Sequence, residues 1–490
     1  MSMLLRGVRV VPVDRPAPDG PVDVRVAGDR VVEVAPGLAP RPGEESLDVA
    51  GRWLIPGLWD AHVHLGQWSR QGTRLSLAGS AGRDDALARI ATAGGAGLLV
   101  GGGYRPAMWT EPPTVSALDG VTGDRPVVMV SGDAHAGWLN SAALRRFGLT
   151  GRDDPMTEAE WFAALPAVLA AEDAQVGPGA YTDALKAAAG LGVVGVCDFE
   201  FEPGFAAWPG RYGAVGVPLR VRTSTYPVDL QAAVAAGLRT GSVLDPVHPL
   251  LTMGALKIIS DGSLNTRTAH CCEPYSDGGH GVQNVPPAEL SDLLGRARRA
   301  GLEVALHAIG DAAVALAVTA FASTGASGSI EHAQLLRQAE IDQMARLGLV
   351  ASVQPAHLLD DRAVTAAIWG AARSARSFPL RALRDAGVRL AMGSDAPVAP
   401  LDPWLAMAAA VHRGEPGDQP WHPEHALTAG EALAASTGGL GTVRPGQLAD
   451  LALLDADPLA PGEPAEVARH LRDLRVATTI VAGRIVHDER

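Results

Sequence analysis

The stretch Ile55-Pro56-Gly57-Leu58-Trp59-Asp60-Ala61-His62-Val63-His64 decides how the rest of the chain is interpreted. It starts as an apolar run with strand character and ends on three polar side chains. Residues two apart on a strand face the same side, so His62 and His64 can bind one metal ion together, with Asp60 pointing the same way. Two packed histidines would explain an isolated pair equally well. The interpretation therefore depends on what surrounds this stretch.

From residue 55 to about residue 435, apolar runs alternate with helical stretches rich in Ala, Leu and Arg. This alternation predicts an α/β fold with a parallel sheet, and eight candidate strands predict a distorted (β/α)8 barrel of the TIM type. The candidate strands are residues 53–60, 193–199, 219–226, 255–261, 303–307, 329–332, 350–355 and 389–395. The gap between the first two is far longer than an ordinary loop. It predicts an inserted subdomain, or lid, at residues 66–190 over the barrel mouth.

Both ends of the chain have the composition of short strands. Residues 4–11, 22–26 and 30–34 are β-rich, and so are residues 450–454 and 478–486. Because chain termini often lie close together, the two ends predict one composite β-sandwich domain made of residues 1–54 and 437–490. The barrel would then occupy residues 55–436.

Composition excludes several classes of protein. The net charge of −13 disfavours a nucleic-acid or anionic-membrane partner, because both require clustered positive charge. No apolar run is long enough for a transmembrane helix, the first residues alternate like a strand rather than a signal peptide, and three cysteines do not make a disulfide framework. We expect a cytoplasmic protein that acts on a small molecule. The sequence is also compatible with a homodimer.

Three further polar residues follow apolar strands, as His62 and His64 do. His307 ends the fifth candidate strand, His332 the sixth and Asp395 the eighth. In a (β/α)8 barrel the active site lies at this end of the strands. Imidazoles with a carboxylate suit zinc, iron or manganese better than calcium or magnesium. Packing alone does not explain five such residues at four strand ends.

Lys257 is one of only two lysines among 41 basic residues, and it stands in an apolar strand. A buried lysine is costly unless it is neutralised or paired. Reaction with CO₂ would give a carbamate whose two oxygens can bridge two metal ions, which arginine cannot form. The plainer interpretation is a lysine paired with Asp261 or another nearby carboxylate.

Four strings of sequence resemble a known family. Residues 55–64 and 441–451 resemble the opening and closing strings of the metal-dependent amidohydrolase superfamily. Residues 133–144 and 257–264 look like its amidohydrolase-3 subgroup, which includes enzymes similar to N-substituted formamide deformylase. Together the four strings span nearly the whole chain.

The resemblance implies the barrel, the β-sandwich and a two-metal site. His62 and His64 would hold one metal, His307 and His332 the second, and carbamylated Lys257 would bridge them. Asp395 would bind the first metal and act as the general base. Members of the subgroup often carry His where this chain has Cys197. One interpretation of Cys197 is a metal ligand, and the preferred one is a small buried residue.

The expected activity is hydrolysis of a non-peptide C–N bond, in an amide, N-acyl or N-formyl amine, by metal-activated hydroxide. The cofactor would be one or two divalent cations, with zinc preferred. Candidate substrate contacts are His135, Arg267 and His357, together with Trp109 in an apolar lid; a plain structural role suits each of them equally well. A mononuclear deaminase and an inactive scaffold are the alternatives. The deaminase would need an acid directly after His307, where Ala308 stands.

Overall fold

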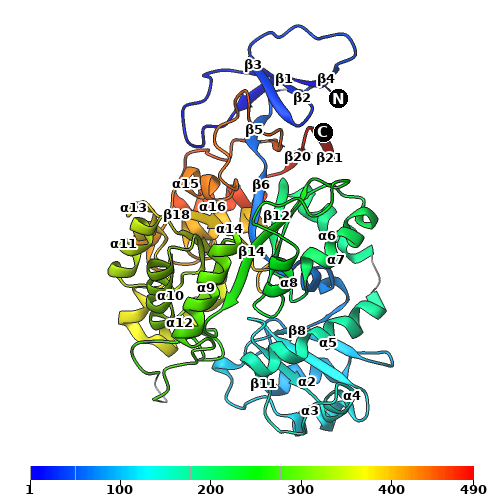
Figure 1. Cartoon of the computed structure of the whole chain (residues 1–490), viewed down its shortest axis with the longest axis vertical. Coiled ribbons are helices and arrows are strands. Elements are labelled where there is room, and N and C mark those ends of the chain that lie inside the picture. The colour runs from blue at the N-terminus through cyan, green and yellow to red at the C-terminus, as the bar shows by residue number, and fades with distance from the viewer. Residues whose placement is uncertain (1, 50, 177–178, 276–277) are drawn as a thin grey trace.

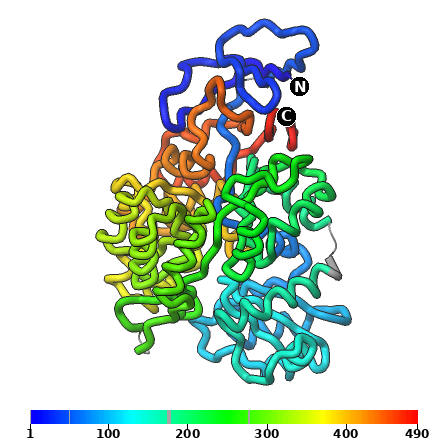
Figure 2. Tube along the Cα trace, viewed as in Figure 1, coloured from blue at the N-terminus to red at the C-terminus, as the bar shows by residue number. Residues whose placement is uncertain are grey.

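A computed structural model describes residues 2–49, 51–176, 179–275 and 278–490. It contains three sheets, which Figure 1 shows as three regions along the molecule: a terminal sheet, a central barrel and an inserted subdomain. The trace in Figure 2 brings both termini to the same end of the molecule. Among the described residues, no helix has the length and apolar character needed to span a bilayer.

The first and last strands of the chain form the terminal sheet, in the order β21-β20-β19-β5-β1-β2-β3, with β4 paired to β1. Its strands are β1 Ser2–Val10, β2 Val22–Ala27, β3 Arg30–Ala35, β4 Glu45–Asp48, β5 Trp53–Pro56, β19 Leu451–Leu454, β20 Val476–Val481 and β21 Arg484–Asp488. The expected sheet built from both termini is therefore confirmed. Domain boundaries at residues 54 and 437 stay predictions.

The first predicted barrel strand, residues 53–60, is wrong as one element. The structure divides it at Gly57 into β5, which pairs with β1 and β19, and β6 Leu58–Val63, which opens the barrel. A Cβ at Gly57 would lie 2.1 Å from the side chain of Val194, so only glycine allows the chain to pass this close to the barrel. The turn from one sheet into the other occurs there.

Eight parallel strands form the barrel, in the order β18-β17-β16-β15-β14-β13-β12-β6. They are β6, β12 Val193–Asp198, β13 Arg220–Thr225, β14 Leu251–Ile259, β15 Val304–Ala308, β16 Gly328–His332, β17 Val350–Val353 and β18 Arg389–Met392. The predicted α/β barrel is confirmed. Between β18 and β6 the ladder is reduced to a bridge between Val63 and Ala396, which is the distortion expected of the barrel.

Helices pack around the barrel and cover its apolar strands. They are α6 Gly179–Gly190, α7 Gly204–Val215, α8 Leu230–Ala235, α9 Pro287–Ala300, α10 Asp311–Thr324, α11 Gln338–Leu347, α12 His357–Ser374, α13 Leu380–Asp385, α14 Pro403–His412, α15 Ala429–Ala435 and α16 Pro464–Asp473. The largest hydrophobic core lies between these helices and the strands. It fixes the strand ends from which the polar residues project.

The inserted subdomain carries its own five-stranded sheet and core, at the cyan end of the molecule in Figure 1. Its strands are β7 Leu75–Ser76, β8 Leu99–Tyr104, β9 Val127–Ser131, β10 Ala136–Leu139 and β11 Met156–Thr157. Its helices are α2 Arg83–Ala91, α3 Val115–Thr122, α4 Ser141–Arg146 and α5 Glu158–Val176, and the short helix α1 Leu65–Ser69 before them packs against α6. These elements lie between β6 and α6, within the predicted insertion.

Candidate metal centre

The seam between the first and last barrel strands positions the carboxylate of the site. The Asp395 amide donates to the His62 carbonyl oxygen over 2.6 Å, and the His64 amide donates to Ala396 over 2.9 Å. A Cβ at Gly393 would lie 2.5 Å from the His62 nitrogen, so glycine is needed for this close approach. The segment after β18 is thereby held against the end of β6.

His62, His64 and Asp395 form the first group that can hold a metal ion, with ligand atoms within 4.8 Å of one another. Asp395 Oδ1 lies 3.4 Å from His62 Nε2 and 3.5 Å from His64 Nε2. Asp395 has a φ of +57°, in the left-handed region that costs a non-glycine residue about 1 kcal/mol. Such strain in a buried carboxylate is typical of a functional position.

A second group shares Asp395. It consists of His332, His357 and Asp395, with His357 Nε2 3.8 Å from Asp395 Oδ2. His332 also has a left-handed φ, +69°. His307, expected beside His332, packs its ring 4.5 Å from that of His332, but its Nε2 lies 3.3 Å from the carbonyl oxygen of Gly262. The structure thus groups His357, expected to contact substrate, with the ligand-type residues.

Burial makes these imidazoles suitable ligands. It holds the pKa of His62, His307 and His332 well below the ordinary value, and it lowers the pKa of His64 and His357 to about 3. Neutral imidazole is the form that binds a metal. The buried nitrogens His332 Nδ1 and His357 Nε2 have no hydrogen-bond partner among the described residues. Since an unpaired buried polar atom is costly, these nitrogens fit a bound cation.

Lys257 reaches the same centre from β14. Its Nζ lies 3.3 Å from His62 Nε2 and 4.4 Å from the centre of the Phe199 ring. Asp261, the partner considered for it, instead accepts backbone hydrogen bonds from His270, Ile309 and Gly310. Burial lowers the pKa of Lys257 to about 8. The neutral amine, the form that reacts with CO₂, is therefore easier to form here than in an exposed lysine.

Glu331 is a site residue that the sequence analysis did not identify. Its Oε2 lies 2.7 Å from His62 Nδ1, and both side chains are about 1% exposed. A carboxylate only accepts, so Nδ1 of His62 carries the proton and Nε2 is left free for a metal. Glu331 directly precedes His332 on β16, and an acid beside a predicted ligand is the signal that could have indicated it.

The inserted subdomain contributes a buried ion pair next to the histidines. His135 Nδ1 lies 3.2 Å from Glu158 Oε2, and the His135 ring lies 5.3 Å from that of His307. The Glu158 carboxylate overcomes the effect of burial and raises the pKa of His135 to about 9. His135 is thus charged at neutral pH, unlike the imidazoles of the metal groups.

A cavity of about 30 Å³ lies between the inserted subdomain and the residues of the metal groups. Arg105, Asp133 and His135 of the inserted subdomain line it together with His332, His357 and Asp395. It also exposes Asn265, whose buried side-chain oxygen and nitrogen both lack partners among the described residues. The subdomain therefore covers the ends of the barrel strands.

Three other residues singled out from the sequence lie elsewhere. Arg267 is exposed at the surface, and Trp109 packs against the core of the inserted subdomain, with its ring 5.8 Å from that of Tyr104. Neither lines the cavity. Cys197 is absent from both metal groups and lies half-buried lower in the barrel, where burial raises its pKa to about 11.

Comparisons with known proteins agree with this geometry. The model of the amidohydrolase family matches residues 45–487. The chain is 29% identical to Protein LONG AFTER FAR-RED 3 of Arabidopsis thaliana over 85% of this chain and 80% of the relative. It is 26% identical to N-substituted formamide deformylase of Arthrobacter pascens over 94% of each. An uncharacterized metal-dependent hydrolase from Pyrococcus horikoshii has a similar structure, with TM-score 0.76, 25% identity and coverage of 94% and 99%.

Proposed function

This chain belongs to the amidohydrolase family, and we propose that it hydrolyses a C–N bond of a non-peptide amide, an N-acyl or N-formyl amine. The observation that carries the proposal is Asp395, which is shared by two groups of neutral imidazoles at the end of the barrel. The similarity to an N-substituted formamide deformylase supports the N-formyl class. The inserted subdomain covers the ends of the barrel strands, which supports a compact substrate over a long peptide.

The donors favour one or two divalent cations, with zinc best suited to imidazole and carboxylate ligands. His62, His64 and Asp395 would hold one ion, and His332 with His357 or His307 would hold the second. Lys257, as a carbamate, would lie between them. When bound, such a cation polarises the amide carbonyl and lowers the pKa of water.

Residues of the chain then transfer the protons and bind the acyl oxygen. Asp395 faces both groups of imidazoles, so its carboxylate would take a proton from the attacking water and release it to the leaving nitrogen. The amide and one water become a carboxylic acid and an amine. His135 Nδ1 is held by Glu158, which leaves Nε2 to donate to the substrate's acyl oxygen.

A substrate panel tests this proposal. Protein supplied with zinc is incubated with N-formyl, N-acetyl and aromatic acyl amines, with dipeptides and with amino-substituted heterocycles. We expect amine and acid in equal amounts from at least one non-peptide amide, and no reaction in chelated protein. Ammonia released from a heterocycle would favour the deaminase, and peptide cleavage alone would contradict the non-peptide assignment. No reaction at all, in protein that binds no metal, would indicate a scaffold.

A further inference from the structure

Asn265 is a buried amide that the fold itself does not use. It is 4% exposed, and both Oδ1 and Nδ2 lack partners among the described residues. The chain has two other asparagines, Asn140 and Asn284. Asn140 Oδ1 accepts from two backbone amides, and Asn284 Nδ2 donates to Glu158 over 3.3 Å. Two unpaired polar atoms in a buried side chain are costly, so they indicate a partner outside the chain.

The turn after β14 that carries Asn265 is held by its neighbours. Ser263 Oγ donates to Asp133 Oδ2 of the inserted subdomain. Thr268 Oγ1 donates to Glu158 Oε1 over 2.5 Å. Asn265 lies between these two anchors in sequence, so the position of the turn does not depend on the Asn265 side chain.

Asn265 lines the cavity between the inserted subdomain and the metal groups. His332, His357 and Asp395, which form the second metal group, line the same cavity. A substrate whose scissile bond lies at these three residues therefore has the Asn265 carboxamide beside it.

The charged residues that the inserted subdomain contributes to this cavity are paired. Arg105 Nη2 lies 2.9 Å from Asp360 Oδ2. Asp133 accepts hydrogen bonds from two serine hydroxyls and from the backbone amide of His135. The His135 ring is held by Glu158. Because these charges are matched, this side of the cavity favours a neutral polar group over an ion.

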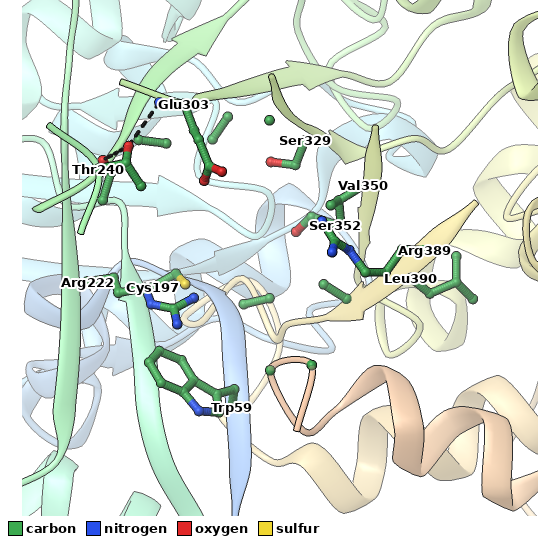
Figure 3. A pocket seen from close by; sticks show the side chains of 18 of the residues that line it. Trp59, Cys197, Arg222, Thr240, Glu303, Ser329, Val350, Ser352, Arg389 and Leu390 are labelled. Carbon is green, nitrogen blue, oxygen red and sulfur yellow. Dashed lines mark hydrogen bonds between the residues drawn. The ribbon is translucent and has the colours of Figure 1, made fainter. Parts of the chain in front are cut away.

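The larger space inside the barrel, of about 680 Å³, does not receive this part of a substrate. Figure 3 shows this space, whose wall holds acidic and basic side chains such as Glu303 and Arg389. Buried Phe199 closes it from the metal centre, with its ring 4.7 Å from that of His62. Asn265 does not line it. A substrate at the metal centre is therefore recognised on the side of the inserted subdomain.

We propose that Asn265 determines specificity by binding a second, neutral amide-type group of the substrate, a carboxamide or ureido group, beside the amide that is cleaved. This rests on the proposed function. Such a group presents an N–H donor next to a carbonyl acceptor, so it satisfies Oδ1 and Nδ2 of Asn265 together. An ester or a carboxylate only accepts and leaves Oδ1 unpaired. The scissile amide does not serve, because its acyl oxygen faces the proposed cation and His135.

Matched substrates test the specificity. Zinc-supplied protein is given glycinamide, glycine methyl ester and glycine, each carrying the acyl group that the substrate panel selects, together with their β-alanine counterparts. We expect kcat/KM for a carboxamide to be at least about tenfold above the matching ester and carboxylate, because these leave a buried acceptor unpaired. Asn265→Leu and Asn265→Ala should each reduce the preference below about threefold. A preference that is absent from wild type, or unchanged in both variants, would overturn the proposal.

Thermal unfolding tests the unpaired amide without any substrate. Asn265→Leu should leave the unfolding midpoint unchanged or raise it, because Leu is close to Asn in size and removes two unpaired polar atoms. Asn140→Leu is the matched control and should lower the midpoint by several degrees, since it leaves backbone amides without their acceptor. An equal fall in the two variants would overturn the proposal.

The two failures are distinguishable. Wild-type protein that hydrolyses no amide would contradict the proposed function. Wild-type protein that hydrolyses amides with no preference for a second carboxamide would contradict only the role of Asn265.

Discussion

The backbone amide of Asp395 donates to the carbonyl oxygen of His62 over 2.6 Å. This hydrogen bond joins the ends of the first and last barrel strands, where the ladder between them is reduced to a bridge. It brings Asp395, the carboxylate common to both metal groups, against His62 and His64 at the end of β6. The distortion of the barrel and the assembly of the site are therefore one structural feature.

Replacing Asp395 by Asn should reduce turnover by about 10²–10⁴-fold, because the amide cannot accept a proton. Asn tolerates the left-handed backbone at this position, so the fold should survive. Turnover, metal content and thermal unfolding are measured together. Asp360→Asn, at an exposed acid that pairs with Arg105 near the cavity, should stay within about twofold of wild type. An Asp395→Asn enzyme with near-normal turnover would remove Asp395 from the proton-transfer role.

Replacing Lys257 by Ala should remove metal and activity, and short carboxylic acids should partly restore both by supplying a bridging anion. Lys257→Arg should stay inactive, because guanidinium stays charged and does not react with CO₂. ¹³C NMR of protein equilibrated with labelled CO₂ should show a carbamate signal that is absent from both variants. Retention of metal and turnover by Lys257→Arg would show that Lys257 is only a buried lysine of the core.

Glu331→Gln should weaken zinc binding by about 10–100-fold, because His62 loses the acceptor that fixes its proton on Nδ1. Competition with a chromophoric chelator measures the affinity. Glu303→Gln is the matched control, since Glu303 is an exposed acid directly before β15 and lies outside both metal groups. Equal affinities in the two variants would argue against a positioning role for Glu331.

The His135–Glu158 pair predicts a loss of stability in alkali. The pKa of His135 is about 9 in the folded protein and 6.5 when it is free, so its contribution is complete below pH 6.5 and is lost as pH rises through 9. The difference corresponds to about 3 kcal/mol. The free energy of unfolding of metal-free protein, measured with urea, should therefore fall as pH rises from 6.5 to 9.5. In His135→Gln this slope should disappear, and an unchanged slope would assign it to another group.

The sequence predicted the barrel and most of its strand ends, because apolar runs followed by His or Asp mark the carboxyl ends of parallel strands. It did not separate β5 from β6, since residues 53–60 are one apolar run and only the contact between Gly57 and Val194 divides them. The grouping of His357 with His332 depends on where α12 begins, and side-chain spacing in sequence does not encode that distance.

The central claim is that this site binds divalent metal and uses it to hydrolyse a C–N bond. A titration of metal-free protein with zinc, monitored by amine release from the best amide of the panel, tests it most directly. The account predicts no activity without metal and a rise that saturates at no more than two equivalents per chain, with binding lost when His62 and His64 are both replaced by Ala. Full activity in chelated protein, or metal binding unchanged in that double variant, would contradict it.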